Sequence, residues 1–163
     1  MFTMRKYRTN DFEKVSNLIR NVYTKQLAPL NSKNANKIFL NYLIASKKSF
    51  GKAKLSLIIE ENGKIIGVLK GKILSKSTLK VSTLFIAIRY QKKGFGSKLL
   101  KKVENNARKI GIQKIILKAN PKAVNFYRKL GYEKTTGIRI LKTLGNLKIQ
   151  PMAKTLKKQR TKP

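Results

Sequence analysis

The sequence contains neither cysteine nor histidine among its 163 residues. The first absence excludes disulfides, thiolate metal sites and a cysteine nucleophile. The second removes the usual metal ligand and the usual general base, so we expect no metal. No run of eighteen apolar residues occurs, and the start of the chain lacks the apolar core and small-residue cleavage site of a signal peptide. We therefore expect a soluble, cytoplasmic protein that does not bind membranes.

Acidic residues are also scarce: 6 stand against 39 lysines and arginines, which gives a formal net charge of +33. Most cations cannot be ion-paired, and the positive field attracts anions. Two interpretations are open, namely weak binding of nucleic acid through the positive surface, or a compositional bias that leaves solvated lysines on every face. The lysines are spread along the chain except at its end, where we expect residues 157–163 to form a basic, disordered tail.

The length suits one compact core and is too short for two, so residues 1–156 are expected to form a single domain. Apolar residues at helical spacing predict a helix from Asn10, with Asn10 and Glu13 spaced as a capping box, and a second helix over residues 34–48 after a break at Pro29. Two apolar runs around Asn62-Gly63 predict a β-hairpin, because this pair tolerates the positive φ of a tight turn.

A strand over residues 79–88, covered on both faces, is expected to lead into a helix that Gly111 ends and a strand over residues 112–119. This βαβ unit predicts two parallel strands with a right-handed crossover. Asn120 and Pro121 supply the N-cap and first position of a further helix, which Gly131 closes, and two antiparallel strands follow. The expected apolar stripe of the helix after the glycine turn is Phe95, Leu99, Val103, Ala107 and Ile110.

Two glycines, Gly94 and Gly96, lie between that strand and helix. The first turn of a helix has unpaired N–H groups and a partial positive charge, and glycine lets an anion approach the backbone closely. No acidic residue occurs between Glu61 and Glu104 to compete with a phosphate. The glycines could instead serve only to form the turn, and the spacing fits neither the P-loop nor the dinucleotide fingerprint.

Two motifs carry a family resemblance. The first, Gln91-Lys92-Lys93-Gly94-Phe95-Gly96, matches the pattern Q/R-x-x-G-x-G/A. The second begins Asn120-Pro121-Lys122-Ala123 and runs to Tyr132, and it matches N-x-x-A-x-x-F-Y-x-x-x-G-F with tyrosine in place of the final phenylalanine. The chain thus resembles the GNAT superfamily of acetyl-CoA-dependent N-acetyltransferases. The resemblance implies a GNAT-like α+β fold, with a mixed, mostly antiparallel twisted sheet, a central parallel βαβ unit and helices on both faces.

The resemblance also implies that acetyl-CoA is a co-substrate. Its pyrophosphate would bind the amides of residues 92–97, its pantetheine arm would lie in a gap between the parallel strands, and Asn120 would position the arm. The residues expected to bind it are Ile86, Ala87, Ile88, Gln91, Lys92, Lys93, Gly94, Phe95, Gly96, Ser97, Asn120, Ala123 and Phe126.

By the same resemblance a backbone N–H near Ile86 polarises the thioester carbonyl and Tyr127 donates a proton to the sulfur, although core packing is an alternative role for Tyr127. Without cysteine, we expect direct transfer to a primary amine in a ternary complex. Glu60 and Glu61 are expected to be solvated, and no base is assigned.

The positive charge of the protein favours neutral or acidic amine carriers, or amines on nucleic acid, as substrates. The protein is expected to be a monomer or homodimer. The alternative function is nucleic-acid binding on the same fold, with acetyl transfer secondary or lost.

Overall fold

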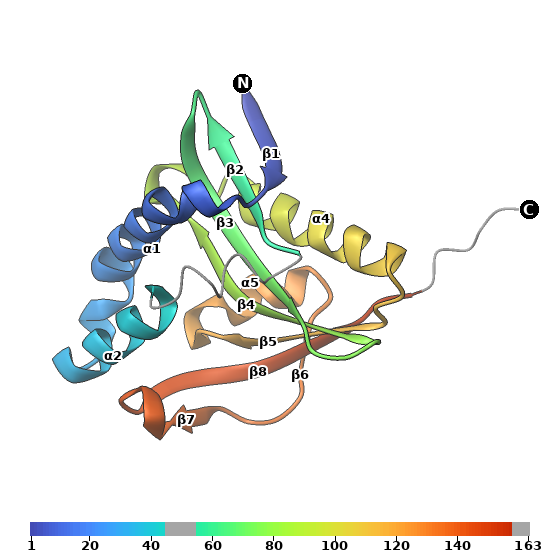
Figure 1. Cartoon of the computed structure of the whole chain (residues 1–163). Helices are drawn as coiled ribbons and strands as arrows, with labels where there is room; N and C mark the ends of the chain where they lie inside the picture. Colours follow the sequence, from blue (N-terminus) through green and yellow to red (C-terminus); the bar gives the residue numbers. More distant parts are fainter. Residues whose placement is uncertain (45–54, 158–163) are drawn as a thin grey trace, which may run out of the picture.

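The computed structural model describes residues 1–44 and 55–157. Its strands form one sheet in the order β1-β2-β3-β4-β5-β8-β6, and β7 pairs with β8 (Figure 1). The strands are β1 (Phe2–Lys6), β2 (Leu57–Glu61), β3 (Lys64–Ile73), β4 (Thr78–Ile86), β5 (Lys114–Ala119), β6 (Glu133–Lys134), β7 (Arg139–Leu141) and β8 (Leu147–Thr155). The helices are α1 (Phe12–Gln26), α2 (Lys33–Ile44), α4 (Phe95–Lys109) and α5 (Val124–Lys129). No helix within these described ranges is long and apolar enough to cross a membrane.

Helices cover both faces of the sheet, which confirms the expected mixed, mostly antiparallel α+β fold. One core cluster lies between the sheet and α1, and a larger one lies between the sheet and α4 with α5. The first cluster includes Val15, Ile19, Tyr23, Ile58 and Val68. The second includes Leu69, Leu79, Leu99, Leu100, Ile115 and Tyr132. We refer to these sides as the α1 side and the α4 side.

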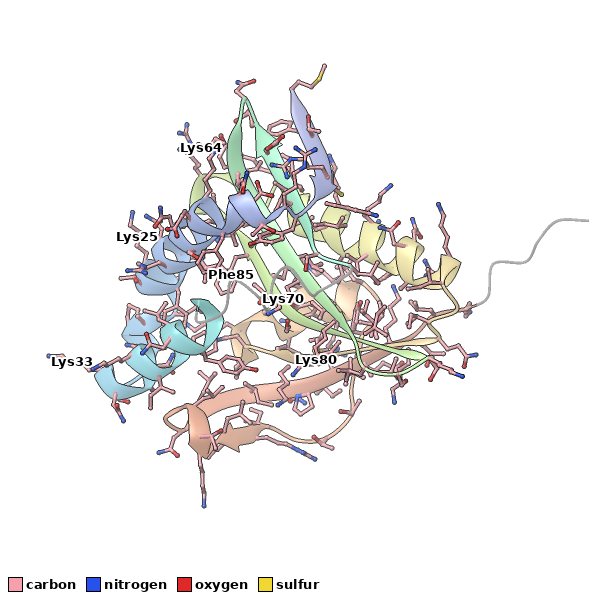
Figure 2. All side chains as sticks on the ribbon, in the orientation of Figure 1. Lys25, Lys33, Lys64, Lys70, Lys80 and Phe85 are labelled. Carbon is pink, nitrogen blue, oxygen red and sulfur yellow. The ribbon has the colours of Figure 1, made fainter. Side chains whose placement is uncertain are left out.

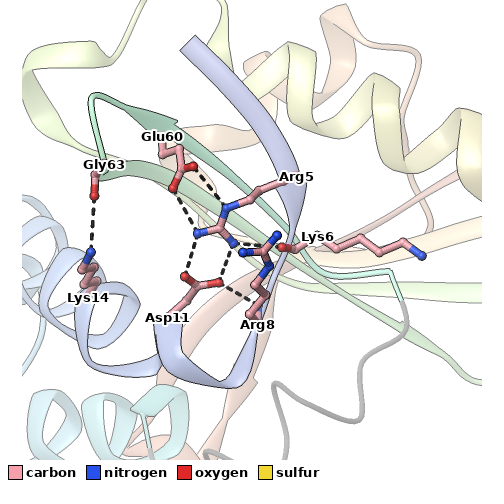
Figure 3. Close-up of polar contacts among 7 residues, drawn as sticks. All are labelled: Arg5, Lys6, Arg8, Asp11, Lys14, Glu60 and Gly63. Atoms are coloured by element: carbon pink, nitrogen blue, oxygen red, sulfur yellow. Dashed lines mark hydrogen bonds and ion pairs between the residues drawn. The ribbon is translucent and has the colours of Figure 1, made fainter. Parts of the chain in front are cut away.

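The start of α1 is held by an ion network rather than by the expected capping box of Asn10 and Glu13. A 3-10 turn precedes α1, and the Asp11 carboxylate accepts from the Arg8 backbone N–H at 2.7 Å. Arg5 binds both Asp11 oxygens at 2.8 Å and the Glu60 carboxylate at 3.0 and 3.2 Å (Figure 3). The prediction that Asn10 caps this helix was wrong, because Asn10 lies inside the 3-10 turn Thr9–Asp11 and the N-cap of α1 is Asp11.

Strand β1 was not expected. It pairs antiparallel with β2 over its whole length and forms one edge of the sheet. The alternation of apolar Phe2 and Met4 with polar Thr3 and Arg5 is a period-two signal that could have predicted it.

Other local predictions hold, with small corrections. The Asn62-Gly63 turn has φ values of 48° and 76° and joins β2 to β3. The predicted second helix is described as α2 up to Ile44, and its predicted residues 45–48 lie outside the described residues, as do residues 158–163 of the predicted tail. Ile110 is 53% exposed instead of extending the apolar stripe, because it lies at the C-cap, where the helix has already ended.

The predicted βαβ unit is present, and its two strands separate where the site lies. β4 and β5 are parallel, but their pairing runs only from Thr78↔Lys114 to Val81↔Leu117. Immediately beyond this, the register of β4 against β3 shifts, leaving Ser82 as an extra residue on β4. Such a bulge bends its strand and ends regular pairing. The rest of β4 therefore faces a gap, because β5 continues to Ala119 but no longer pairs with β4.

Candidate active site

The backbone of β4 presents polar groups to this gap. The Ala87 N–H donates to the Ile66 carbonyl at 2.8 Å, so Ala87 faces β3. Polar groups of successive strand residues point to alternate sides, so those of Ile86 and Leu84 point away from β3 and into the gap. The Ala87 carbonyl also accepts from the Tyr90 N–H at 2.8 Å. Of the residues expected to line the arm, Ile86 can therefore offer its N–H, whereas both polar backbone groups of Ala87 are used within the protein.

The glycine turn that follows holds a row of unused donors. Lys92 and Gly94 have positive φ values of 59° and 82°, and this alternation of backbone conformation directs successive N–H groups to one side. The first intrahelical hydrogen bond of α4 runs from the Lys98 N–H to the Gly94 carbonyl at 3.0 Å, and Gly94 has no side chain to cap the helix. Within the described residues, no backbone acceptor is recorded for the N–H groups of residues 92–97.

Packing on the α4 side holds this uncapped helix end in place. Leu99, Leu100, Val103 and Ala107 have no exposed surface. Burying one leucine contributes about 2 kcal/mol, whereas a missing N-cap costs about 1 kcal/mol. The core can therefore hold free N–H groups at the start of α4 without help from a capping side chain.

The two glycines leave different kinds of space. A Cβ at Gly94 would meet no atom within 4 Å, so the turn is open on that side and glycine is needed there for its positive φ. A Cβ at Gly96 would lie 3.3 Å from Cζ of Phe126 and 3.8 Å from Cγ1 of Ile86. Gly96 therefore lets the second motif, on α5, approach the first motif, on α4. A phosphate group fits this arrangement, since the donors are free and the approach is unobstructed.

Gln91, the first residue of the motif, is bonded within the protein. Its Nε2 donates to the Ile86 carbonyl and to Oε1 of Gln26, each at 2.9 Å, and Nε2 of Gln26 donates back to Oε1 of Gln91 at 2.9 Å. This amide pair joins the end of α1 to the turn. Gln26 was not expected from the sequence, because a polar residue on the last turn of a helix carries no signal of a distant partner.

Tyr127 lies on α5 in the α4-side core, and its side chain is nearly buried. Its ring contacts those of Phe126 and Tyr132, with centroid distances of 5.0 and 5.8 Å. Its hydroxyl forms no hydrogen bond within the described part of the chain, and the residue is 9% exposed. Burial raises the pKa of Tyr127 to about 12, so the hydroxyl stays protonated at neutral pH.

The remaining predicted residues lie around these groups. The Oδ1 of Asn120 accepts from the Lys122 N–H at 2.9 Å, which confirms the predicted N-cap and leaves the side-chain NH₂ without a recorded partner in the described ranges. Ala123 is half-buried, and Ile88 is exposed. Phe95 packs against Phe2 of β1 at a centroid distance of 4.7 Å, a contact that the sequence analysis missed along with β1.

The sequence predicted that the two acids of the hairpin are solvated, but both are only partly exposed and both have partners within the protein. Glu60 is bound by Arg5, and Glu61 accepts from the Tyr90 hydroxyl. Glu104 is buried and is held by Lys154 at 2.7 Å and by the Tyr132 hydroxyl at 3.1 Å. Among the described residues no group of three or more acids, histidines or cysteines could hold a metal ion.

The sequence profile of the acetyltransferase (GNAT) domain family matches residues 21–156, and the chain therefore belongs to this family. This confirms the resemblance drawn from the two motifs. No curated protein matches the sequence.

Solved structures share the fold at low identity. The PaiA N-acetyltransferase from Thermoplasma acidophilum, in complex with coenzyme A, is 21% identical with a TM-score of 0.76, covering 95% of this chain and 99% of that one. The ribosomal-protein-S18-alanine N-acetyltransferase from Escherichia coli is 19% identical with a TM-score of 0.71, covering 100% and 99%. A GCN5-related N-acetyltransferase from Rhodopseudomonas palustris is 18% identical with a TM-score of 0.76, covering 94% and 95%.

Proposed function

We propose that the protein transfers the acetyl group of acetyl-CoA to a primary amine by direct attack in a ternary complex. The observation that carries this proposal is the row of N–H groups of residues 92–97, which have no acceptor in residues 1–44 and 55–157, beside the gap between β4 and β5. Membership of the acetyltransferase family and the coenzyme A complex of the Thermoplasma acidophilum relative support it.

In this proposal the glycine turn binds the pyrophosphate. The N–H groups of residues 92–97 donate to its oxygens, and the positive end of α4 adds a favourable potential. Lys92 and Lys93 are exposed and contribute charge. The pantetheine arm extends along β4 and adds to the sheet where β5 has separated, with Ile86 and Leu84 as backbone partners. The Asn120 side-chain NH₂ donates to the arm from the other side of the gap.

Tyr127 assists the departing sulfur as a hydrogen-bond donor. A phenol with a pKa of about 12 is a weaker acid than a thiol of pKa about 8.5, so full proton transfer to the thiolate is uphill by about 5 kcal/mol. A donated hydrogen bond stabilises the developing negative charge without this penalty. The raised pKa therefore favours stabilisation of the thiolate over the general-acid role expected from the sequence.

The attacking amine must be neutral, and the positive field of the protein lowers the pKa of a bound ammonium group. Neither β4 nor β5 carries an acidic residue. The amine proton therefore passes to water as the tetrahedral intermediate collapses. The amide forms as the C–S bond breaks, and coenzyme A leaves as the thiol after protonation from solvent.

Calorimetry with coenzyme A and a thiol-release assay with acetyl-CoA test this proposal. Because the protein has no cysteine, it contributes no background to a thiol-reactive dye. Coenzyme A at about 100 times its Kd should stabilise the fold by about 2.7 kcal/mol, which raises Tm by roughly 5–10 °C for a chain of this size. Absence of any heat of association at millimolar coenzyme A would contradict the proposal.

A further inference from the structure

Three lysines lie together on the α1 side of the middle strands. Lys70 and Lys72 are two residues apart on β3, and Lys80 on β4 is the direct pairing partner of Lys72. The neighbours of Lys80 along the strand, Leu79 and Val81, belong to the α4-side core, so strand alternation puts Lys80 on the opposite face. Figure 2 shows Lys70 and Lys80 below α1 and to the right of α2. We call Lys70, Lys72 and Lys80 the lysine cluster.

The cluster works against stability. Like charges directly opposite each other in an antiparallel pair are unfavourable. Burial lowers the pKa of Lys70, and the charges of Lys72 and Lys80 lower it further. Neither Lys72 nor Lys80 forms an ion pair within the described residues, where the recorded ion pairs gather around Arg5 and Glu104. Lys72 and Lys80 repel each other and have no ion-pair partner in the described ranges, so an anion can stabilise this pair.

The cluster borders the gap on the side opposite to the glycine turn. Lys80 precedes Val81, the last residue of β4 that pairs with β5, and the exposed bulge residue Ser82 follows. Lys118, between two α4-side core residues of β5, projects onto the same α1-side face across the gap and is exposed. The arm of acetyl-CoA enters from α4, so an amine that attacks its thioester approaches from the α1 side, past these lysines.

We propose that the lysine cluster binds the anionic part of the acceptor, so that the substrate is an amine whose own molecule carries carboxylate or phosphate groups. This inference rests on the proposed acetyl transfer, because it takes the gap as the reaction centre. The nitrogens of Lys72 and Lys80 supply charge-assisted hydrogen bonds to the anion, and the amine extends from it to the thioester.

A single-stranded nucleic acid is a different class of partner, and the surface favours it less. Such binding combines a basic groove with exposed aromatic rings on which bases stack. Phe85 is the aromatic residue of β3, β4 and β5, and it packs against the α1-side core. The three lysines also occupy adjacent positions on two strands and form a compact patch suited to a small anionic group.

The test uses a short fluorescent peptide with a free amino terminus and two aspartates, and a neutral counterpart with two asparagines. Binding is followed by fluorescence anisotropy with saturating coenzyme A, which occupies the glycine turn. Removing one exposed lysine from an ion pair weakens binding about two- to fivefold, so the double variant Lys72→Ala/Lys80→Ala should weaken binding of the acidic peptide about tenfold. The matched control, Lys101→Ala/Lys102→Ala on the exposed side of α4, removes the same charge and should leave the affinity within twofold.

Three results would overturn the inference. The acidic peptide could bind equally weakly to both double variants, it could fail to bind the unmodified protein, or the neutral peptide could bind the unmodified protein with equal affinity. Competition by a single-stranded oligonucleotide that binds more tightly than the peptide, and only with the cluster intact, would assign the cluster to nucleic acid instead. Calorimetry with coenzyme A tests the proposed function separately. If coenzyme A does not bind, the same peptide titration without it still decides whether the cluster binds anionic amines.

Discussion

Replacing Gly94 by alanine should weaken coenzyme A binding without unfolding the protein. Gly94 has φ +82°, and a Cβ there meets no atom within 4 Å, so the cost is conformational. A non-glycine residue in this left-handed region costs about 1–2 kcal/mol. The turn can relieve the cost by rotating, which moves N–H groups away from the pyrophosphate. One charge-assisted hydrogen bond is worth about 1.5–3 kcal/mol, so the loss of one N–H contact raises Kd at least about tenfold.

Gly111 provides a matched control. It has φ +83° with no atom within 4 Å of a Cβ, but it lies just beyond the other end of α4. Gly111→Ala should therefore lower stability by the same about 1–2 kcal/mol, a fall in Tm of roughly 2–8 °C, and leave Kd for coenzyme A unchanged. Thermal unfolding measures the first quantity and isothermal calorimetry the second. A folded Gly94→Ala protein that binds coenzyme A as tightly as Gly111→Ala would refute the role given to the turn.

Two further substitutions test the tyrosine and the N-terminal ion network. Tyr127→Phe should lower kcat about 10²-fold and leave coenzyme A affinity and Tm close to those of the unmodified protein, since the hydroxyl has no partner within the described chain. The control is Tyr42→Phe, at an exposed tyrosine of α2. An unchanged kcat in Tyr127→Phe would reject the role of a hydrogen-bond donor. Hydrogen bonds from Arg5 are the main cause of the lowered pKa of Asp11, so the carboxylate stabilises the fold above its unfolded pKa of about 3.9 and loses this contribution as pH falls through the lower folded value. Asp11→Asn should cost about 1–3 kcal/mol at pH 6 and flatten the dependence of Tm on pH below about pH 4. A slope equal to that of the unmodified protein would argue against this linkage.

Several elements could be predicted because their causes are local. Asn62-Gly63 turns the hairpin through positive φ, and Asn120 caps the next turn with its own side chain. Local patterns failed at the N-terminus, where Arg5 holds Asp11 and Glu60 from different parts of the chain. The two hairpin acids look solvated in the sequence, because nothing near them in the chain reveals a partner as distant as Arg5.

The candidate site divides in the same way. The turn at Gly94 and Gly96, the helix behind it and the second motif with Tyr127 are visible in the sequence. The extra residue Ser82 and the end of pairing at Val81 are not, since a bulge depends on how three strands fit together. The bonds of Gln91 to Gln26 and Ile86 were equally invisible.

By itself the sequence determined the fold class, the βαβ unit and the glycine turn, because backbone conformation and helical periodicity are set by residues close together in the chain. Only the tertiary structure decided that β4 and β5 separate beside that turn. It also decided that Lys72 and Lys80 lie opposite each other at the edge of the gap, since strand register and the choice of face are set by packing between distant segments.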